Sequence, residues 1–257
     1  MQAQSLPLAY GYLWIQGGWR LFKAQPMALL FWSLATHILL QISFLLPLIG
    51  QATLLVLTPG MTFIVLNASK RIQEGHTMRM ADWLSPVKAE AVRKALIRLG
   101  FLYMLCSLII AFIAIAPFMS NIMQSVDEHG QVEFATLLAA MQKPMTVFTI
   151  LYLLLSGLFW HAPALVGWHA IPIKQALFYS MVACWRNKWA FILYGAFWFV
   201  LIYASKELAN ILLANGIQSA SAQFILTPIN MALMAVLYAS FYPAYQTIFR
   251  RDNNTDH

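Results

Sequence analysis

Residues 27–66 read MALLFWSLATHILLQISFLLPLIGQATLLVLTPGMTFIVL, forty residues without one Asp, Glu, Lys or Arg. A membrane-spanning helix needs about 20 mostly apolar residues, so this stretch is long enough for two. Pro47 and Gly50 interrupt it near its middle, and both residue types favour a tight turn. The stretch therefore predicts a hairpin of two antiparallel spans, residues 27–46 and 48–66.

Four further stretches are apolar and long enough to cross a bilayer: residues 96–119, 145–168, 189–206 and 222–249. The chain of 257 residues is 61% hydrophobic and only 10% charged, against about 45–50% and about 25% in globular proteins. A soluble surface could not cover so much apolar area. We expect an all-α integral membrane protein with six transmembrane helices, a single polytopic domain of residues 1–251 followed by a polar cytoplasmic tail, residues 252–257.

The basic residues are distributed unevenly between the two sides of this topology. Of the 16 Lys and Arg residues only Lys143 and Lys206 fall on one side, and the other 14 fall opposite. Loops rich in Lys and Arg stay in the cytoplasm. We therefore expect a bacterial inner-membrane protein with both termini cytoplasmic and the first span acting as an uncleaved anchor. Because Cys106 lies inside a span, a structural disulfide with Cys184 is not expected.

The spans pair into three hairpins that show traces of a repeat. Leu57-Thr58-Pro59 in the second span recurs as Leu226-Thr227-Pro228 in the sixth, and the fourth carries Ala162-Pro163-Ala164. The alternative is that any multi-span protein contains such prolines. We interpret Pro59, Pro163 and Pro228 as tolerated helix kinks, because neighbouring helices can satisfy the freed carbonyls. They could instead form hinges or line a substrate path.

Amphipathic segments flank the spans. On the cytoplasmic side these are residues 14–23, a stretch opened by Ser85-Pro86, and residues 171–185, and on the far side residues 127–143. Each alternates apolar and charged residues at helical spacing. The cytoplasmic three are typical of helices lying in the membrane interface.

Four polar side chains fall deep inside the spans. His37 and Gln41 lie one turn apart in the first span, His161 lies in the fourth and Asn230 in the sixth. We favour interhelical hydrogen bonds for them, with a polar lumen as the alternative. Haem ligation by His37 and His161 is a weaker hypothesis, because neither span holds a second histidine at the same depth.

Seven basic residues in the cytoplasmic stretch from Lys70 to Arg98 predict contacts with anionic head groups, each worth on the order of 1 kcal/mol near the surface. A cytoplasmic acidic protein is the alternative partner, and nucleic acid is not expected, because no binding motif accompanies the charge. The seven are Lys70, Arg71, Arg79, Lys88, Arg93, Lys94 and Arg98.

The sequence holds none of the common catalytic or metal-binding motifs. We find no HExxH, no GxxxxGK phosphate loop, no GxSxG and no metal-spaced Cys/His cluster. We therefore expect no catalytic residues, no metal and no cofactor. An intramembrane enzyme is the least favoured function.

Two segments resemble a family of uncharacterised proteobacterial six-span inner-membrane proteins. They are His161-Ala-Pro-Ala-Leu-Val-Gly-Trp-His169, continued by Lys174-Gln-Ala-Leu and Ala183-Cys-Trp-Arg-Asn187, and the opening Gly18-Trp-Arg-Leu-Phe-Lys-Ala-Gln-Pro26. The resemblance covers nearly the whole chain and implies the fold and location already derived, but no activity.

The leading functional hypothesis is a non-enzymatic, membrane-embedded scaffold or lipid-interacting accessory component. Its partners would be membrane lipids, with a protein partner or a homo-oligomer as a further hypothesis. The main rival is a small-solute or lipid transporter with a path between the hairpins. A cavity joining His37, Gln41, His161 and Asn230 would favour transport, and paired side chains in a dry interior would favour the scaffold.

Overall fold

The computed structural model describes residues 3–125 and 134–250, and these ranges hold helices and no strand. Six helical segments within them are long and apolar enough to cross a membrane. This confirms the prediction of an all-α protein with six membrane-spanning helices. The six are α2 (Pro26–Leu45), α3 (Ile49–Gln73), α4 to α5 (Glu90–Met123), α6 to α7 (Phe134–His169), α9 (Lys188–Ala214) and α10 (Ser219–Ile248).

Two of these segments are broken helices. The third is α4 (Glu90–Ile115), a 3₁₀ turn η3 (Ala116–Phe118) and α5 (Met119–Met123). The fourth is α6 (Phe134–Phe159) followed by α7 (Ala162–His169). Outside the six spans lie α1 (Tyr10–Ala24), the 3₁₀ turns η1 (Met80–Asp82) and η2 (Ser85–Val87), and α8 (Ile173–Arg186).

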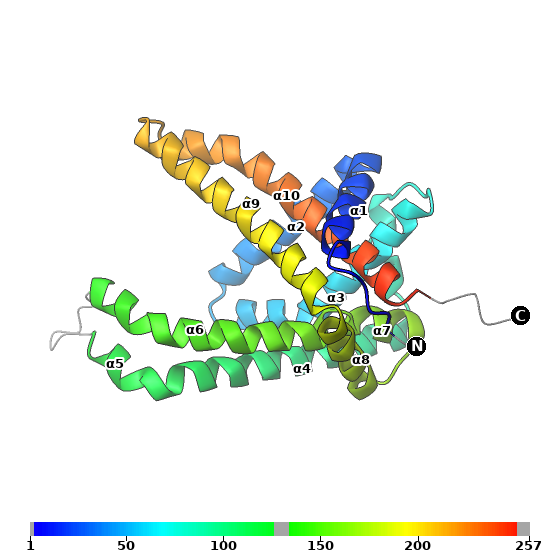
Figure 1. Ribbon diagram of the computed structural model, residues 1–257, viewed down its shortest axis with the longest axis horizontal. Coiled ribbons are helices and arrows are strands. Elements are labelled where there is room, and N and C mark those ends of the chain that lie inside the picture. Colours follow the sequence, from blue (N-terminus) through cyan, green and yellow to red (C-terminus); the bar gives the residue numbers. More distant parts are fainter. Residues whose placement is uncertain (1–2, 126–133, 251–257) are drawn as a thin grey trace, which may run out of the picture.

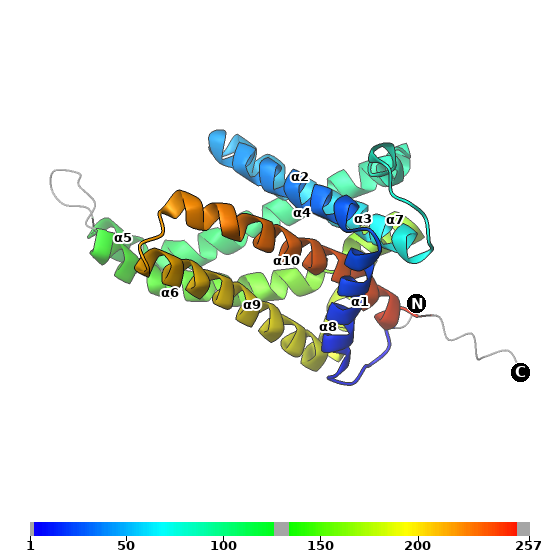
Figure 2. The same ribbon diagram turned by 90° about the horizontal axis from the view of Figure 1, so that it is seen from above.

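The molecule has two unlike ends (Figure 1). At the first, which we call the terminal end, α1, α7, α8 and the end of α10 gather near the N-terminus (Figures 1 and 2). At the second, the distal end, lie α5, the start of α6 and the turn between α9 and α10. In both views α1 runs across the long axis, whereas the spans run along it.

The amphipathic segments differ in their structure. Residues 14–23 are helical within α1, and the predicted segment 171–185 is helical from Ile173 onward, within α8, whereas Ser85-Pro86 opens only the short turn η2 before α4 begins at Glu90. Residues 127–133 of the far-side segment lie outside the described residues, and from Phe134 onward that segment is the first part of α6, continuous with the span. The interfacial position of α1 and α8 stays a prediction.

Glycines mark the places where helix backbones meet. A Cβ built on Gly18 of α1 would lie 2.7 Å from the carbonyl oxygen of Val236 on α10. Gly11 of α1 meets the Ala190 carbonyl of α9 in the same way, and Gly100 of α4 meets that of Val56 on α3. Small residues allow such approach between helices in lipid, where packing replaces the hydrophobic drive. The glycines therefore fix how α1 lies across α9 and α10.

Polar contacts add to this packing. The indole Nε1 of the fully buried Trp14 donates to Thr247 Oγ1 on α10 at 2.8 Å. Tyr194 on α9 and Ser240 on α10 share a hydrogen bond of 2.6 Å between their hydroxyls. Helix α10 is thereby joined to both α1 and α9. These contacts use the interhelical hydrogen bonds that membrane interiors favour.

The buried Asn187, between α8 and α9, ties the N-terminal segment to the terminal end. Its Oδ1 accepts from the Leu6 N–H at 2.8 Å, and its Nδ2 donates to the carbonyl oxygens of Gln4 at 2.8 Å and Ala183 at 2.9 Å. Each net hydrogen bond contributes roughly 1 kcal/mol, so the Asn187 side chain holds the N-terminal segment against α8 and α9. The backbone of that segment also reaches the end of α10, where the Gln4 N–H donates to the Ile248 carbonyl at 2.9 Å.

We predict that Gly18→Ala lowers stability, because its new methyl group must displace Val236 or Ser240 backbone atoms. Overpacking of this kind costs about 1–3 kcal/mol. Gly60→Ala is the matched control, since a Cβ there meets nothing within 4 Å, and it should be neutral or slightly stabilising. Thermal unfolding of both variants in the same detergent measures the difference. Equal melting temperatures would show that the α1 crossing is looser than described.

Candidate functional site

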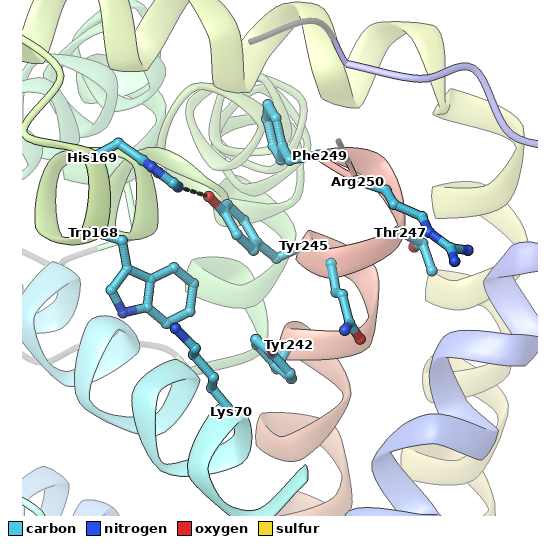
Figure 3. A pocket seen from close by; sticks show the side chains of 9 residues that line it. Lys70, Trp168, His169, Tyr242, Tyr245, Thr247, Phe249 and Arg250 are labelled. Atoms are coloured by element: carbon cyan, nitrogen blue, oxygen red, sulfur yellow. Dashed lines mark hydrogen bonds between the residues drawn. The ribbon is translucent and has the colours of Figure 1, made fainter. Parts of the chain in front are cut away.

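A pocket of about 640 Å³ opens at the terminal end, between the ends of α3, α7 and α10 (Figure 3). We call it the terminal pocket. Its walls are aromatic and polar side chains from segments far apart in the sequence. They are Lys70, Trp168, His169, Tyr242, Tyr245, Gln246, Thr247, Phe249 and Arg250.

The terminal pocket carries two cations and no acidic side chain among its described lining residues. Lys70 Nζ lies over the Trp168 ring, 5.5 Å from its centroid, a favourable cation–π geometry. The ammonium is also 4.0 Å from Glu74 Oε1 at the rim. Arg250 is exposed and lies across Tyr245 from Lys70 and Trp168 (Figure 3). The pocket is therefore electropositive at its mouth.

Aromatic rings and one hydrogen bond give the pocket its shape. The Trp168 and Tyr245 rings meet edge to face at 5.1 Å, and the Tyr245 hydroxyl lies 2.8 Å from His169 Nε2 (Figure 3). Tyr242, Tyr245 and Phe249 recur three and four residues apart on α10 and its end, which places them on one face of the helix. The short helix α7 ends at His169 and is followed by Ala170 in the left-handed conformation (φ 52°). Trp168 and His169, in its last turn, lie in the pocket wall.

A second pocket of about 650 Å³ lies between α4, α7 and the start of α8, and we call it the α4–α8 pocket. Arg98 and Lys174 supply its charges. Gly167 of α7 and Ala170, which follows that helix, line it too, on either side of the residues that line the terminal pocket. The two pockets therefore flank α7 at the same end of the molecule.

The deep polar residues of the first span lie at the lateral surface. His37 and Asn230 line one cavity of about 230 Å³ between α2 and α10, together with Thr227. Gln41 Nε2 lies 3.4 Å from His37 Nε2 and does not line that cavity. Asn230 Oδ1 accepts from Ser205 Oγ of α9 at 2.6 Å. His37, Gln41 and Asn230 are all exposed, so the structure brings these three residues near one face.

His161 lies apart from them. It is only 1% exposed, at the break between α6 and α7, and its ring packs near Phe191, Tyr245 and Phe249. Its backbone N–H donates to Ser180 Oγ at 3.0 Å, while its ring Nε2 has no hydrogen-bond partner among the described residues. His161 and His37 share no cavity described here.

The predicted head-group residues are in varied surroundings. Lys70 and Arg98 line the two pockets. Others pair locally: Arg71 lies 3.9 Å from Asp82, and Lys94 lies 2.6 Å from Glu90. The remaining three, Arg79, Lys88 and Arg93, lie on the connection into α4 or in its first turn. The backbone N–H of Arg79 donates to Asp82 Oδ2 at 3.0 Å. Arg93 Nη1 donates to the Lys88 carbonyl at 3.3 Å.

The prolines occupy two kinds of position. Pro59 and Pro228 lie inside α3 and α10, whereas Pro163 lies in the first turn of α7, just after the helix break. Thr58 Oγ1 donates to the Leu54 carbonyl at 2.8 Å. Pro59 has no N–H to donate to the carbonyl four residues before it. The carbonyl that Thr58 binds is one residue earlier still.

Reactive or metal-binding groups do not gather elsewhere in the described residues. Residues 3–125 and 134–250 hold no group of three His, Cys, Asp or Glu that could bind a metal ion. Both cysteines are free. Burial raises the pKa of the Cys184 thiol to about 12, so this side chain is protonated and a poor nucleophile at neutral pH.

Sequence reasoning did not find most of the terminal pocket. Lys70 was expected to touch head groups, but Tyr242, Tyr245, Gln246 and Arg250 were not singled out. The available signal was the aromatic spacing at the end of the last span. It could not be tied to Trp168 and Lys70, because contacts between α3, α7 and α10 are set by packing alone.

The fold and these pockets define a multi-pass α-helical membrane protein. The chain is 30% identical to Probable inner membrane protein BTH_II0599 of Burkholderia thailandensis, over 97% of this chain and 94% of that protein. The chain belongs to the family of that protein. No family model matches it, and no solved structure matches it.

We predict that Tyr245→Phe destabilises the terminal end by about 1 kcal/mol, because it removes the hydroxyl that bonds His169 Nε2. Tyr203→Phe is the control, since Tyr203 is 54% exposed on α9 and its hydroxyl contributes little. Hydrogen exchange of the segment around His169 measures the effect. Equal protection in the two variants would mean that the bond does not hold α7.

Proposed function

We propose that this protein is a non-enzymatic, lipid-interacting accessory or scaffold component of the bacterial inner membrane. The observation that carries the proposal is the terminal pocket, which is lined by Lys70, Arg250 and four aromatic rings, with no acidic residue among its described lining. The family relative carries "inner membrane protein" in its name, which supports the location. The full sequence holds no catalytic motif, which supports a non-enzymatic role.

The sides of the molecule suit contact with acyl chains. Large apolar side chains are exposed along the spans, for example Phe112 (73%), Leu153 (67%) and Phe199 (70%). Such surface is unusual for a soluble monomer and ordinary in lipid. The terminal pocket lies at one end of this apolar belt, which is the position of lipid head groups.

The charge distribution supports the orientation that we propose, with both termini cytoplasmic. Lys70, Arg98, Lys174, Lys188 and Arg250 belong to elements that meet at the terminal end, whereas Lys143 lies near the start of α6. The cytoplasmic leaflet is the anionic one, and it attracts basic residues by roughly 1 kcal/mol each. Attraction to this leaflet therefore orients the protein with its basic terminal end toward the cytoplasm and keeps that end at the head groups.

The polar residues on the lateral face are compatible with a homo-oligomer or a protein partner. His37 and Gln41 are exposed near the middle of α2, where lipid offers no hydrogen bonds. A neighbouring chain would offer partners and cover them. Native mass spectrometry of the protein in lipid nanodiscs would report the number of subunits together with retained lipids.

We predict that the protein retains phosphatidylglycerol over phosphatidylcholine in that measurement. The double variant Lys70→Ala/Arg250→Ala should weaken retention roughly tenfold or more, since two cations near head groups contribute about 2 kcal/mol together. Lys143→Ala/Lys206→Ala removes the same charge from other positions and should change little. Equal retention in the two double variants would contradict a head-group role for the terminal pocket.

Transport is the rival function, and one observation favours it. Two cavities lie beside α2, one of about 230 Å³ with His37 and Asn230 and one of about 210 Å³ with Thr36, Thr58 and Thr62. Thr36, Leu40 and Tyr238 line both. A joined, water-filled path here would carry a small solute or a lipid head group across part of the membrane.

We predict no His37-dependent flux in proteoliposomes. Vesicle swelling with glycerol and arabinose measures solute entry, and dithionite quenching of fluorescent phosphatidylglycerol measures lipid translocation. Wild-type, His37→Ala and Gln41→Ala proteins should match protein-free vesicles, because neither residue shares a cavity with His161. Reproducible flux that is lost in His37→Ala would replace the scaffold proposal with transport.

A further inference from the structure

The α4–α8 pocket combines an apolar wall with two cations. Ala91, Ala95 and Val166 form part of its wall, and Arg98 from α4 and Lys174 from α8 contribute the charges. The volume of about 650 Å³ falls in the range of small-molecule sites. This combination of an apolar wall and charged side chains matches an amphiphile that has a charged head and an apolar body.

The two cations lack counter-charges. Neither Arg98 nor Lys174 has a carboxylate oxygen within 4.0 Å in the part of the chain that the structure describes, and no acidic side chain from that part lines the pocket. One turn earlier on α4, Lys94 is paired with Glu90 at 2.6 Å. Arg98 and Lys174 therefore bring two positive charges to one pocket, without a counter-charge among the described residues, and an anion there would be attracted by both.

Helix stability does not account for Lys174. It is the second residue of α8, where the helix dipole disfavours a positive charge. A cation that only stabilised α8 would lie in the last turn, as Arg186 does. Lys174 therefore makes no favourable interaction with the dipole of its own helix.

The depth of Arg98 points to a membrane ligand. Arg98 lies eight residues into α4, about 12 Å along the axis. Its neighbours Ile97 and Phe101 are 41% and 55% exposed, so the apolar, lipid-facing surface of α4 begins at this level. A ligand that touches Arg98 can therefore keep an apolar body in the bilayer.

We propose that the α4–α8 pocket binds the phosphate of a membrane phospholipid between Arg98 and Lys174. The guanidinium binds two phosphate oxygens at once, the ammonium contacts a third group of the head, and the glycerol region lies against Ala91 and Ala95. This inference rests on the proposed lipid-interacting function but on a pocket distinct from the one that carries it.

The test is native mass spectrometry of the full chain from nanodiscs that contain phosphatidylglycerol. Arg98→Gln/Lys174→Gln should release one tightly bound phosphatidylglycerol per protein and weaken its retention about tenfold. Arg98→Lys keeps the positive charge but removes the two-pronged guanidinium group, so lipid retention should fall to an intermediate level. Lys143→Gln/Lys206→Gln is the matched control, which removes the same charge from α6 and α9, and it should retain the lipid. Unchanged melting temperatures show that the exposed substitutions leave the fold intact.

Three outcomes would overturn the inference. If Arg98→Gln/Lys174→Gln behaves as Lys143→Gln/Lys206→Gln while Lys70→Ala/Arg250→Ala loses lipid, the proposed function stands and this site fails. If oleate, an anionic lipid without phosphate, is retained through Arg98 as strongly, the site is not a phosphate site. If millimolar glycerol phosphate displaces the lipid, the ligand is a soluble phosphate ester. No retention of anionic lipid by the wild type would instead refute the proposed function itself.

Discussion

Close packing of helix backbones is the constraint on which the rest of this structure depends. In lipid there is no hydrophobic drive between helices, so van der Waals contact and interhelical hydrogen bonds must hold them. Gly18 lets α1 lie against the Val236 carbonyl, and Gly100 lets α4 lie against that of Val56. Trp14 and Tyr194 then add hydrogen bonds to α10. With α1, α3 and α10 held in this way, the ends of distant segments meet at the terminal end.

The segments that carry the family resemblance are contact residues of that end. Gly167 of α7 lies against the Phe63 ring of α3, which a Cβ would meet at 2.2 Å. Trp168 and His169 follow it into the terminal pocket. Asn187 binds the N-terminal segment through Leu6 and Gln4. The sequence pattern that carries the resemblance therefore contributes to the walls of both basic pockets, because α7 lies between them.

Burial and exposure divide the polar residues in a way that the sequence could not. His37 and His161 look equivalent as lone histidines in apolar spans. In the structure His37 is exposed on α2 beside a small cavity, whereas His161 is enclosed by Phe191, Tyr245 and Phe249. The difference arises from the break after Phe159, which turns His161 toward α8 and the end of α10. The same break puts Pro163 at the start of a helix rather than inside one.

By itself, the sequence determined that the protein is helical and spans a membrane six times, because the length and polarity of each stretch leave lipid as the only suitable solvent. It also determined which residues are basic and in which connections they lie. Only the tertiary structure decided that Lys70 meets Trp168 in a pocket that Arg250 also lines, and that Arg98 shares a pocket with Lys174. Those meetings depend on which helix faces contact each other, and close packing between segments distant in sequence leaves no local signal in the chain.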